Sequence, residues 1–173
     1  LNNMKAIIYT PIKNKTLISI ADSFKLEKID ELPYHLTFYS LELLDNKKRE
    51  LEEIVEKIRT SIIPLKIRIN RVETTGYRIA RFSIKKSTSL QKLHERILRE
   101  CRIFKNKNIE SKVREFYHEF SREEQELIDL YGRPNVMQRF SPHITIGKIG
   151  NNPIRRNLDI AFNIDDIAVY YIT

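Results

Sequence analysis

Two short segments that resemble each other decide the interpretation of this chain: YHLTF at residues 34–38 and PHITI at residues 142–146. Each contains a histidine, an apolar residue, a threonine and a second apolar residue. Side chains on a β-strand alternate between its two faces, so the histidine and the threonine of each segment share one face. Each segment therefore predicts a strand that buries an apolar edge and presents an imidazole beside a hydroxyl.

The repetition of this motif favours a functional interpretation. The chain has four histidines and nine threonines, so about 0.2 His-x-Thr matches are expected by chance, and two or more on the order of 2% of the time. A single match would fit a half-buried histidine hydrogen-bonded to its neighbours. Two matches on two strands can converge on one ligand. The candidate catalytic residues are His35, Thr37, His143 and Thr145.

Around these motifs, apolar residues alternate at strand spacing or recur at helical spacing. Strands are predicted at 4–10, 34–41, 65–72, 77–85, 142–149, 160–164 and 167–172, and helices at 17–24, 51–62, 90–101, 113–120 and 121–132. The last two strands are expected to close as a pair about Asp165 and Asp166. This order predicts a mixed, largely antiparallel α+β fold rather than the strict alternation of a doubly wound sheet.

Three helix starts are also predicted from capping residues. Asp45 or Asn46 is the expected N-cap of the second helix. Thr88 with Gln91 is a candidate capping box for the third. A second capping box, Ser121 with Glu124, predicts a helix that ends near Gly132.

Composition limits the classes of protein that fit. The chain has 173 residues and a net charge of +8, which favours an anionic partner, although positive charge alone also serves solubility. Its single cysteine, Cys101, excludes an intramolecular disulfide and suits a reducing cytosol. No apolar run approaches the roughly 20 residues of a membrane helix, and no signal peptide is visible. We therefore expect a cytoplasmic protein that does not enter a membrane.

The paired His-x-Thr motifs, the length under 200 residues and the element order resemble the two-histidine (2H) phosphoesterase superfamily. This group includes proteins called RNA 2′,5′-ligases and cyclic nucleotide phosphodiesterases. The resemblance includes Pro142 before the second histidine, and Gly147 with Lys148 after the motif, where many relatives have a small residue and then arginine.

The resemblance implies one bilobal domain over residues 1–173, with two largely antiparallel sheets, flanking helices and pseudo-twofold symmetry around a central cleft. It implies one His-x-Thr from each lobe, no metal and no cofactor, and we expect a monomer. The sequence agrees about the metal, because it contains no His-x-His, Cys-x-x-Cys or Asp-x-Asp pattern. A helical insert at about 107–132 does not fit the pattern and leaves the substrate class open.

Opening a cyclic phosphodiester needs a base to activate water and an acid to protonate the departing oxygen, and two imidazoles can supply both. The resemblance suggests His143 as the base and His35 as the acid, although pseudo-symmetry leaves the opposite assignment open. The two threonine hydroxyls can donate to the non-bridging oxygens of the phosphate. Lys148 would supply positive charge.

Two further residues have open roles. Tyr39 is expected to continue the face of the first motif, where it either stacks on a base or ribose or packs in the core. Arg139 reaches either the phosphate or the solvent. By contrast, His94 and Cys101 fall on the apolar stripe of one helix and are expected to be packing residues.

The sequence therefore predicts a phosphoesterase that hydrolyses 2′,3′-cyclic phosphates of RNA ends or nucleotides, with reversible 2′,5′-RNA ligation as a related activity. Two alternatives remain. One is a non-catalytic RNA-binding module in which the histidines are incidental. The other is a cyclic phosphodiesterase that acts on a small metabolite derived from ADP-ribose.

Overall fold

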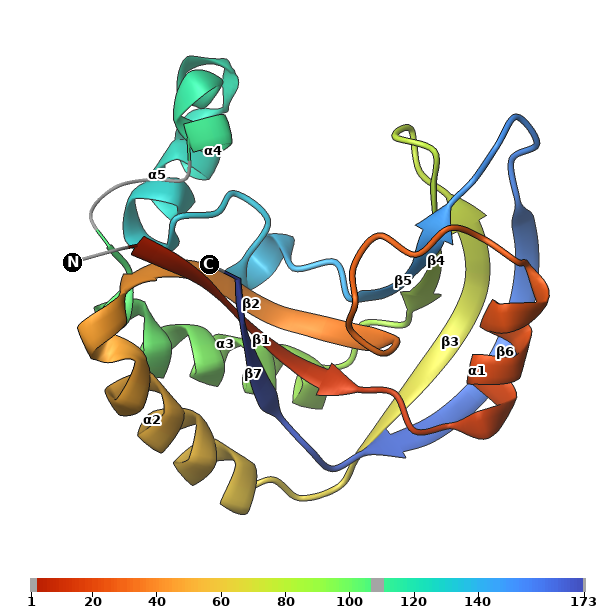
Figure 1. Cartoon of the computed structure of the whole chain (residues 1–173), viewed down its shortest axis with the longest axis horizontal. Helices are drawn as coiled ribbons and strands as arrows, with labels where there is room; N and C mark the ends of the chain where they lie inside the picture. The colour runs from red at the N-terminus through yellow and green to blue at the C-terminus, as the bar shows by residue number, and fades with distance from the viewer. Residues whose placement is uncertain (1–2, 107–110, 173) are drawn as a thin grey trace.

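The computed structural model describes residues 3–106 and 111–172 (Figure 1). Its strands are β1 (Asn3–Pro11), β2 (His35–Leu44), β3 (Leu65–Thr74), β4 (Ile79–Ile84), β5 (His143–Lys148), β6 (Arg155–Ile164) and β7 (Ala168–Ile172). Its α-helices are α1 (Lys15–Ser23), α2 (Lys48–Thr60), α3 (Thr88–Cys101), α4 (Ser111–Glu115) and α5 (Arg122–Tyr131). Short 3₁₀ turns cover Asp45–Lys47, Arg102–Phe104, Tyr117–Glu119 and Met137–Arg139.

All seven strands form one antiparallel sheet in the order β6-β3-β4-β5-β2-β1-β7. Two halves, β7-β1-β2 and β5-β4-β3-β6, meet between β2 and β5 through the pair Leu36 and Ile144. The α+β class with a largely antiparallel sheet is thus confirmed. The two expected sheets are continuous, because the two motif strands pair with each other at the centre.

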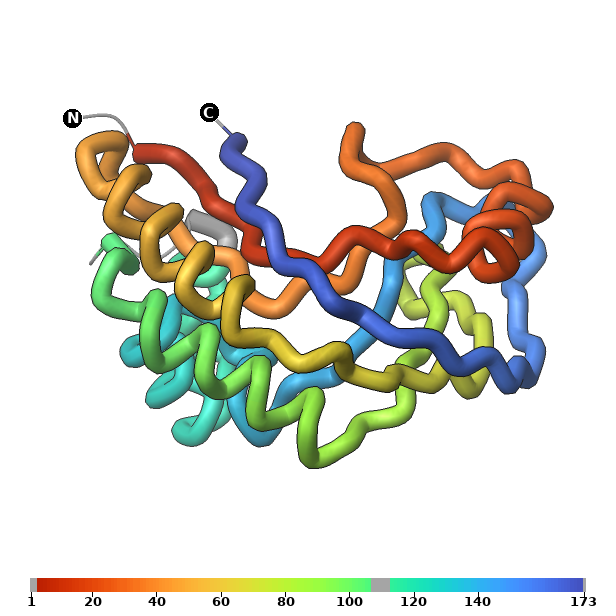
Figure 2. Tube along the Cα trace, turned by 90° about the horizontal axis from the view of Figure 1, so that it is seen from below, coloured from red at the N-terminus to blue at the C-terminus, as the bar shows by residue number. Residues whose placement is uncertain are grey.

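Helices flank this sheet. Figure 2 shows α2 and α3 side by side beneath the half that contains β2, β1 and β7. Leu51, Val55 and Ile58 of α2 are buried there, as are Leu90, Ile97 and Leu98 of α3. The helix α1 lies at the end of the sheet that carries β3 and β6, and α4 and α5 project from the opposite end (Figure 1). None of the helices in the described ranges is long and apolar enough to cross a bilayer.

The expected pairing of the last two strands is wrong. β6 pairs with β3 and β7 pairs with β1, so these two strands form opposite edges of the sheet. Ile164 and Ile167, on either side of the connection, are 4% and 2% exposed. Burial of these two side chains holds the connection against the core, so the chain crosses between the edges instead of folding back as a hairpin.

The helix starts match the predictions in part. The capping box of Ser121 with Glu124 is present, and α5 ends at Gly132 in the left-handed conformation. The α3 helix is instead capped by Ser87, whose hydroxyl accepts from Leu90 N. A 3₁₀ turn leads into α2, and its N-cap residue, Lys47, makes no side-chain cap.

Part of the expected helical insert at 107–132 lies outside the described residues, at 107–110. In the rest, the helix predicted over 113–120 is broken: α4 ends at Glu115, and a 3₁₀ turn follows. These elements stand above the sheet on one side, and the β3–β4 hairpin rises on the other (Figure 1).

Candidate active site

The two His-x-Thr motifs lie next to each other at the centre of the sheet. Leu36 and Ile144 are antiparallel partners, and both are fully buried. In this register, His35 lies opposite Thr145, and Thr37 lies opposite His143. Because side chains alternate along a strand, all four project from the face opposite to Leu36 and Ile144, and all four are half-buried. We call them the His-Thr quartet.

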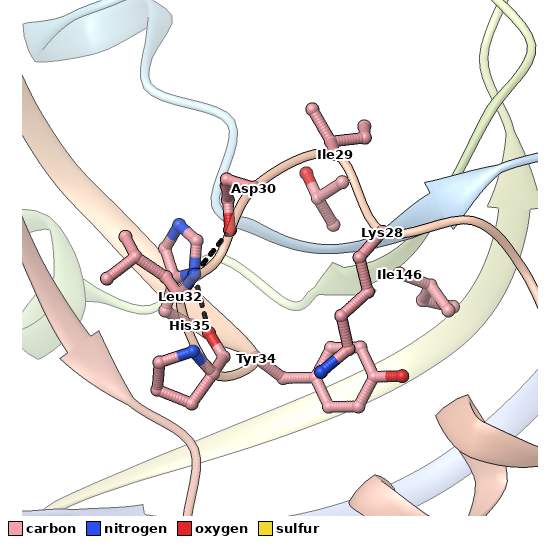
Figure 3. A pocket seen from close by; sticks show the side chains of 9 residues that line it. Lys28, Ile29, Asp30, Leu32, Tyr34, His35 and Ile146 are labelled. Carbon is pink, nitrogen blue, oxygen red and sulfur yellow. Dashed lines mark hydrogen bonds between the residues drawn. The ribbon is translucent and has the colours of Figure 1, made fainter. Parts of the chain in front are cut away.

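One backbone carbonyl fixes each imidazole of the quartet. His35 Nδ1 lies 2.8 Å from Pro33 O, and His143 Nδ1 lies 2.9 Å from Ser141 O. A carbonyl can only accept, so each Nδ1 carries the proton and donates it. Figure 3 shows the contact of His35 with the loop that precedes it. In both rings Nε2 is left to exchange a proton with a ligand.

The surroundings of His143 favour its neutral form. Burial has the largest effect and lowers the pKa of His143, while the hydrogen bond to Ser141 O opposes the shift. The positive charge of Arg81 and the nearby imidazole of His35 lower this pKa further, and Glu73 acts in the opposite direction. His143 is therefore suited to accept a proton near neutral pH.

A polar cluster holds Arg81 beside the quartet. In the sheet, Arg81 is the partner of Thr145, and Ser83 is the partner of His143. Glu73 Oε1 accepts from Ser83 Oγ at 2.6 Å and from Arg81 Nη2 at 3.1 Å. The hydrogen bond from Ser83 and the ion pairs with Arg81 and Arg71 lower the pKa of Glu73, so its carboxylate stays ionised. The guanidinium of Arg81 is thereby held where its charge acts on His143.

Each motif is followed by a β-bulge at the same place. Thr37 pairs with Tyr9, but the next pair joins Tyr39 to Ile8, so Phe38 is an extra residue in β2. The same irregularity in β5 makes Ile146 the extra residue. An extra residue shifts the alternation of side chains by one position.

The bulge corrects the expectation that Tyr39 continues the face of His35. Tyr39 is 1% exposed, and its hydroxyl donates to Tyr131 O at 2.7 Å. Burial raises the pKa of this phenol. Tyr39 is therefore a core aromatic residue, which is one of the two alternatives that the sequence left open. The next half-buried position along β2 is that of Ser40.

Lys148 and Arg139 both pair with carboxylates. Lys148 Nζ lies 3.7 Å from Glu27 Oε1, and this lysine side chain is 59% exposed. Arg139 Nη2 donates to Glu124 Oε1 at 2.7 Å, and Glu123 lies 4.0 Å from the same guanidinium. Arg139 thus contacts α5 while its side chain is 37% exposed. Its contact with a phosphate stays a prediction.

Gly147 lets a neighbouring segment cross close over β5. Lys148 N donates to Glu27 O at 2.8 Å. A Cβ added at Gly147 would lie 2.5 Å from the same oxygen. Only a residue without a side chain fits under this backbone. The crossing segment continues into the loop that carries Pro33, so it helps to fix the approach to His35.

Two cavities of similar volume flank the quartet. The first has a volume of about 430 Å³ and is lined by Thr37, His143 and Arg133, so we call it the Arg133 pocket. Its other polar lining residues are Ser40, Asn135 and Ser141. The second, about 440 Å³, has His143 and Thr145 in its wall; we call it the hairpin pocket, and its outer residues are Glu73–Tyr77, Ile79 and Arg81. A smaller cavity, about 20 Å³, lies under the loop between His35 and Thr145 (Figure 3).

Three residues near the quartet were not predicted as site residues. The ring of Tyr9 meets that of His35 edge-on at 5.4 Å. Arg133 donates to Ser40, with Nη2 3.3 Å from Oγ. No pattern marks Tyr9 or Arg133, because their places depend on strand pairing and on the loop before β5. Ser40 reaches the face only because of the bulge.

His94 and Cys101 are core residues, as predicted. His94 is fully buried, Nδ1 donates to Phe38 O at 3.0 Å, and Nε2 accepts from Met137 N at 2.9 Å. Its ring stacks on Phe140 at 3.7 Å. Burial raises the pKa of the Cys101 thiol to about 12, which opposes a role as a nucleophile. Across residues 3–106 and 111–172, no group of three or more His, Cys, Asp or Glu side chains is placed to hold a metal ion.

Comparison with known proteins agrees with this arrangement. The chain is similar in structure to the protein TT0787 of Thermus thermophilus, with a TM-score of 0.65 and 11% sequence identity over 95% of this chain and 86% of that one. At this identity the likeness shows the fold alone. No curated protein matches the chain in sequence. The sequence profile of the 2′-5′ RNA ligase superfamily matches residues 13–171, and the chain therefore belongs to that superfamily.

Proposed function

We propose that this protein is a metal-independent phosphoesterase that hydrolyses 2′,3′-cyclic phosphates of RNA ends or nucleotides, and that it also joins and cleaves 2′,5′ linkages of RNA. The observation that carries the proposal is the His-Thr quartet, in which both imidazoles are fixed through Nδ1 and keep Nε2 for the substrate. Membership of the superfamily supports the reaction class. A cyclic phosphate would bind between the two histidines.

In the proposed hydrolysis, water attacks phosphorus and gives a proton to His143 Nε2. One P–O ester bond breaks, and the departing ribose oxygen takes a proton from His35 Nε2, which leaves a phosphomonoester. The lowered pKa of His143 supports its assignment as the base. The hydroxyls of Thr37 and Thr145 donate to the non-bridging oxygens, where charge must be stabilised in the transition state.

Positive charge around the quartet would bind the phosphate. Lys148 follows the second motif and is exposed, and its ion pair with Glu27 is solvent-accessible, so the pair is weak enough to yield to a phosphate. We further propose that the protein acts as a monomer in the cytoplasm, consistent with its one free, buried cysteine.

Turnover in EDTA tests the proposal directly. The substrates are a 2′,3′-cyclic mononucleotide and a short RNA with a cyclic end. We expect hydrolysis at an unchanged rate with the chelator, and a bell-shaped pH profile, because one imidazole must be neutral and the other protonated. Loss of activity in EDTA that Mg²⁺ or Zn²⁺ restores would refute metal independence.

The same assay separates the alternatives. Salt-dependent RNA binding without turnover of either substrate would support a non-catalytic RNA-binding module. Turnover of a cyclic phosphate derived from ADP-ribose, with neither RNA nor mononucleotide accepted, would indicate the small-metabolite enzyme.

A further inference from the structure

We propose that the hairpin pocket binds a nucleobase of the 2′,5′-linked substrate and that Tyr77 stacks on this base. The inference rests on the proposed function for the position of the phosphate. It adds a subsite and a specificity-determining residue at the tip of the β3–β4 hairpin.

The positions of the two large pockets give the first argument. His143 belongs to the walls of both, and each pocket also contains one threonine of the quartet. A phosphate held by the quartet would thus have a cavity of about 430 Å³ on one side and one of about 440 Å³ on the other. A phosphodiester joins two nucleosides through one phosphorus, so a linked pair of nucleosides matches this layout. A cyclic mononucleotide would fill only one of the two cavities.

Backbone hydrogen bonds fix the hairpin tip that carries Tyr77. Arg78 N donates to Thr75 O at 3.0 Å, and Thr75 N donates to Ile79 O at 2.8 Å. These bonds close a three-residue loop in which Arg78 takes the left-handed position, with φ 57°. Ile149 N also donates to Arg78 O at 2.9 Å and ties the tip to the end of β5. Three backbone hydrogen bonds therefore hold the turn at the hairpin tip in place.

The left-handed residue of such a loop is ordinarily glycine, because any other side chain adds strain. Here Arg78 occupies it, next to Tyr77 in the chain, and Arg78 is exposed. Strained residues of this kind cluster at active sites and ligand-binding sites. A positively charged residue that follows an aromatic residue in the chain suits an anionic, base-bearing ligand.

The ring of Tyr77 has no packing role in the fold. It is 90% exposed, the largest exposed fraction among the large hydrophobic residues in the described part of the chain. Yet Tyr77 also lines the hairpin pocket, together with Thr145. An aromatic ring offered to solvent at the rim of a catalytic pocket is a stacking surface for a nucleobase.

Polar groups in the same pocket complete the subsite. Thr75 Oγ1 is buried and finds no hydrogen-bond partner among residues 3–106 and 111–172. A buried hydroxyl without a partner carries an energetic cost, and Thr75 is one of the residues that line the hairpin pocket. Arg81 also lines this pocket, where its guanidinium can contact phosphate or ribose oxygens.

Equilibrium binding tests the subsite without requiring turnover. The probes are a 2′,5′-linked dinucleotide whose 3′-hydroxyl is replaced by hydrogen, so that it cannot cyclise, and its two halves, a nucleoside 2′-phosphate and a nucleoside 5′-phosphate. We expect Tyr77→Ala to raise the Kd of the dinucleotide about 5- to 100-fold. Only one of the two halves should lose affinity to a similar extent. Tyr77→Phe, which keeps the ring, should bind within about twofold of the wild type.

The matched control is Ile63→Ala, which removes an apolar side chain that is 82% exposed and lies outside both pockets. It should leave all three Kd values unchanged. An unchanged Kd for the dinucleotide in Tyr77→Ala, or an equal loss for both halves, would overturn the subsite. Dinucleotide binding that depends on Tyr77, with no turnover of cyclic phosphates, would keep the subsite and refute the proposed hydrolysis. No binding of any probe to the wild type would overturn both.

Discussion

Each imidazole of the quartet depends on one carbonyl two residues before it in the chain. Pro33 O and Ser141 O accept from Nδ1 of His35 and His143, at 2.8 and 2.9 Å. These contacts set the tautomer as well as the orientation, because they leave Nε2 for the proposed proton transfer. The sequence revealed the two histidines but not these contacts, since a carbonyl acceptor is available at every residue.

Arg81 should control the pH at which the base becomes active. Its charge lowers the pKa of His143, so Arg81→Ala should raise that pKa, the more so because Glu73 loses a cationic partner. If His143 must be neutral to accept a proton, the acid limb of the kcat/KM profile moves to higher pH. A pH series of kcat/KM on a cyclic mononucleotide measures this shift.

The control for Arg81 is Arg68→Ala, which breaks an exposed ion pair with Asp159 on the same sheet. Its pH profile should equal that of the wild type. An acid limb that stays in place in Arg81→Ala, or moves to lower pH, would remove His143 from the role of base.

At the scale of secondary-structure elements, the bulges in β2 and β5 explain what alternation alone could not predict. The pattern placed the histidine and threonine of each motif correctly on one face, because the alternation is regular up to the threonine. The extra residues Phe38 and Ile146 then shift the alternation. Tyr39 therefore lies in the core. A bulge depends on the partner strand, which a single segment does not reveal.

The crossing of the segment around Glu27 over β5 requires a residue without a side chain at 147. Gly147→Ala would bring a Cβ to 2.5 Å from Glu27 O, so the backbone must move. We expect a loss of about 1–3 kcal/mol in the free energy of unfolding, measured by urea denaturation. Gly150→Ala is the control, because nothing lies within 4 Å of its added Cβ, and equal losses in both variants would contradict the close-packing explanation.

His94 joins three elements and should make the fold sensitive to acid. It connects α3 to the bulge residue Phe38 and to Met137, which precedes β5. Burial lowers the pKa of His94 from 6.5 to about 4. Between these values the unfolded chain binds the proton and the folded chain does not, so falling pH favours unfolding. The contribution of neutral His94 to the free energy of unfolding is fully present above about pH 6.5. It falls by up to about 3 kcal/mol as the pH decreases towards 4.

Urea unfolding of wild type and His94→Gln at several pH values measures this contribution. Glutamine retains a donor and an acceptor but does not titrate in this range. The variant should lose less stability than the wild type between pH 6.5 and pH 4, the range set by the two pKa values. Parallel pH dependences would show that His94 does not take up a proton on unfolding.

At the scale of the whole molecule, the sequence predicted the elements better than their partners. The strand and helix order followed from local periodicity, and the antiparallel α+β class followed from that order. The pairing of β6 with β3 and of β7 with β1 did not follow from local periodicity, because the partner of a strand depends on burial across the whole sheet. The two halves of the site are brought together by the same long-range pairing, at Leu36 and Ile144.

The most direct test of the account is whether the two motifs act as one site. The measurement is kcat for His35→Ala, His143→Ala and the double variant on a 2′,3′-cyclic phosphate. Each single substitution should lower kcat by about 10²–10⁴, and the double variant should lose far less than the product of the two, because both histidines serve one reaction. A double loss equal to that product, or a single variant that retains wild-type kcat, would contradict a shared site.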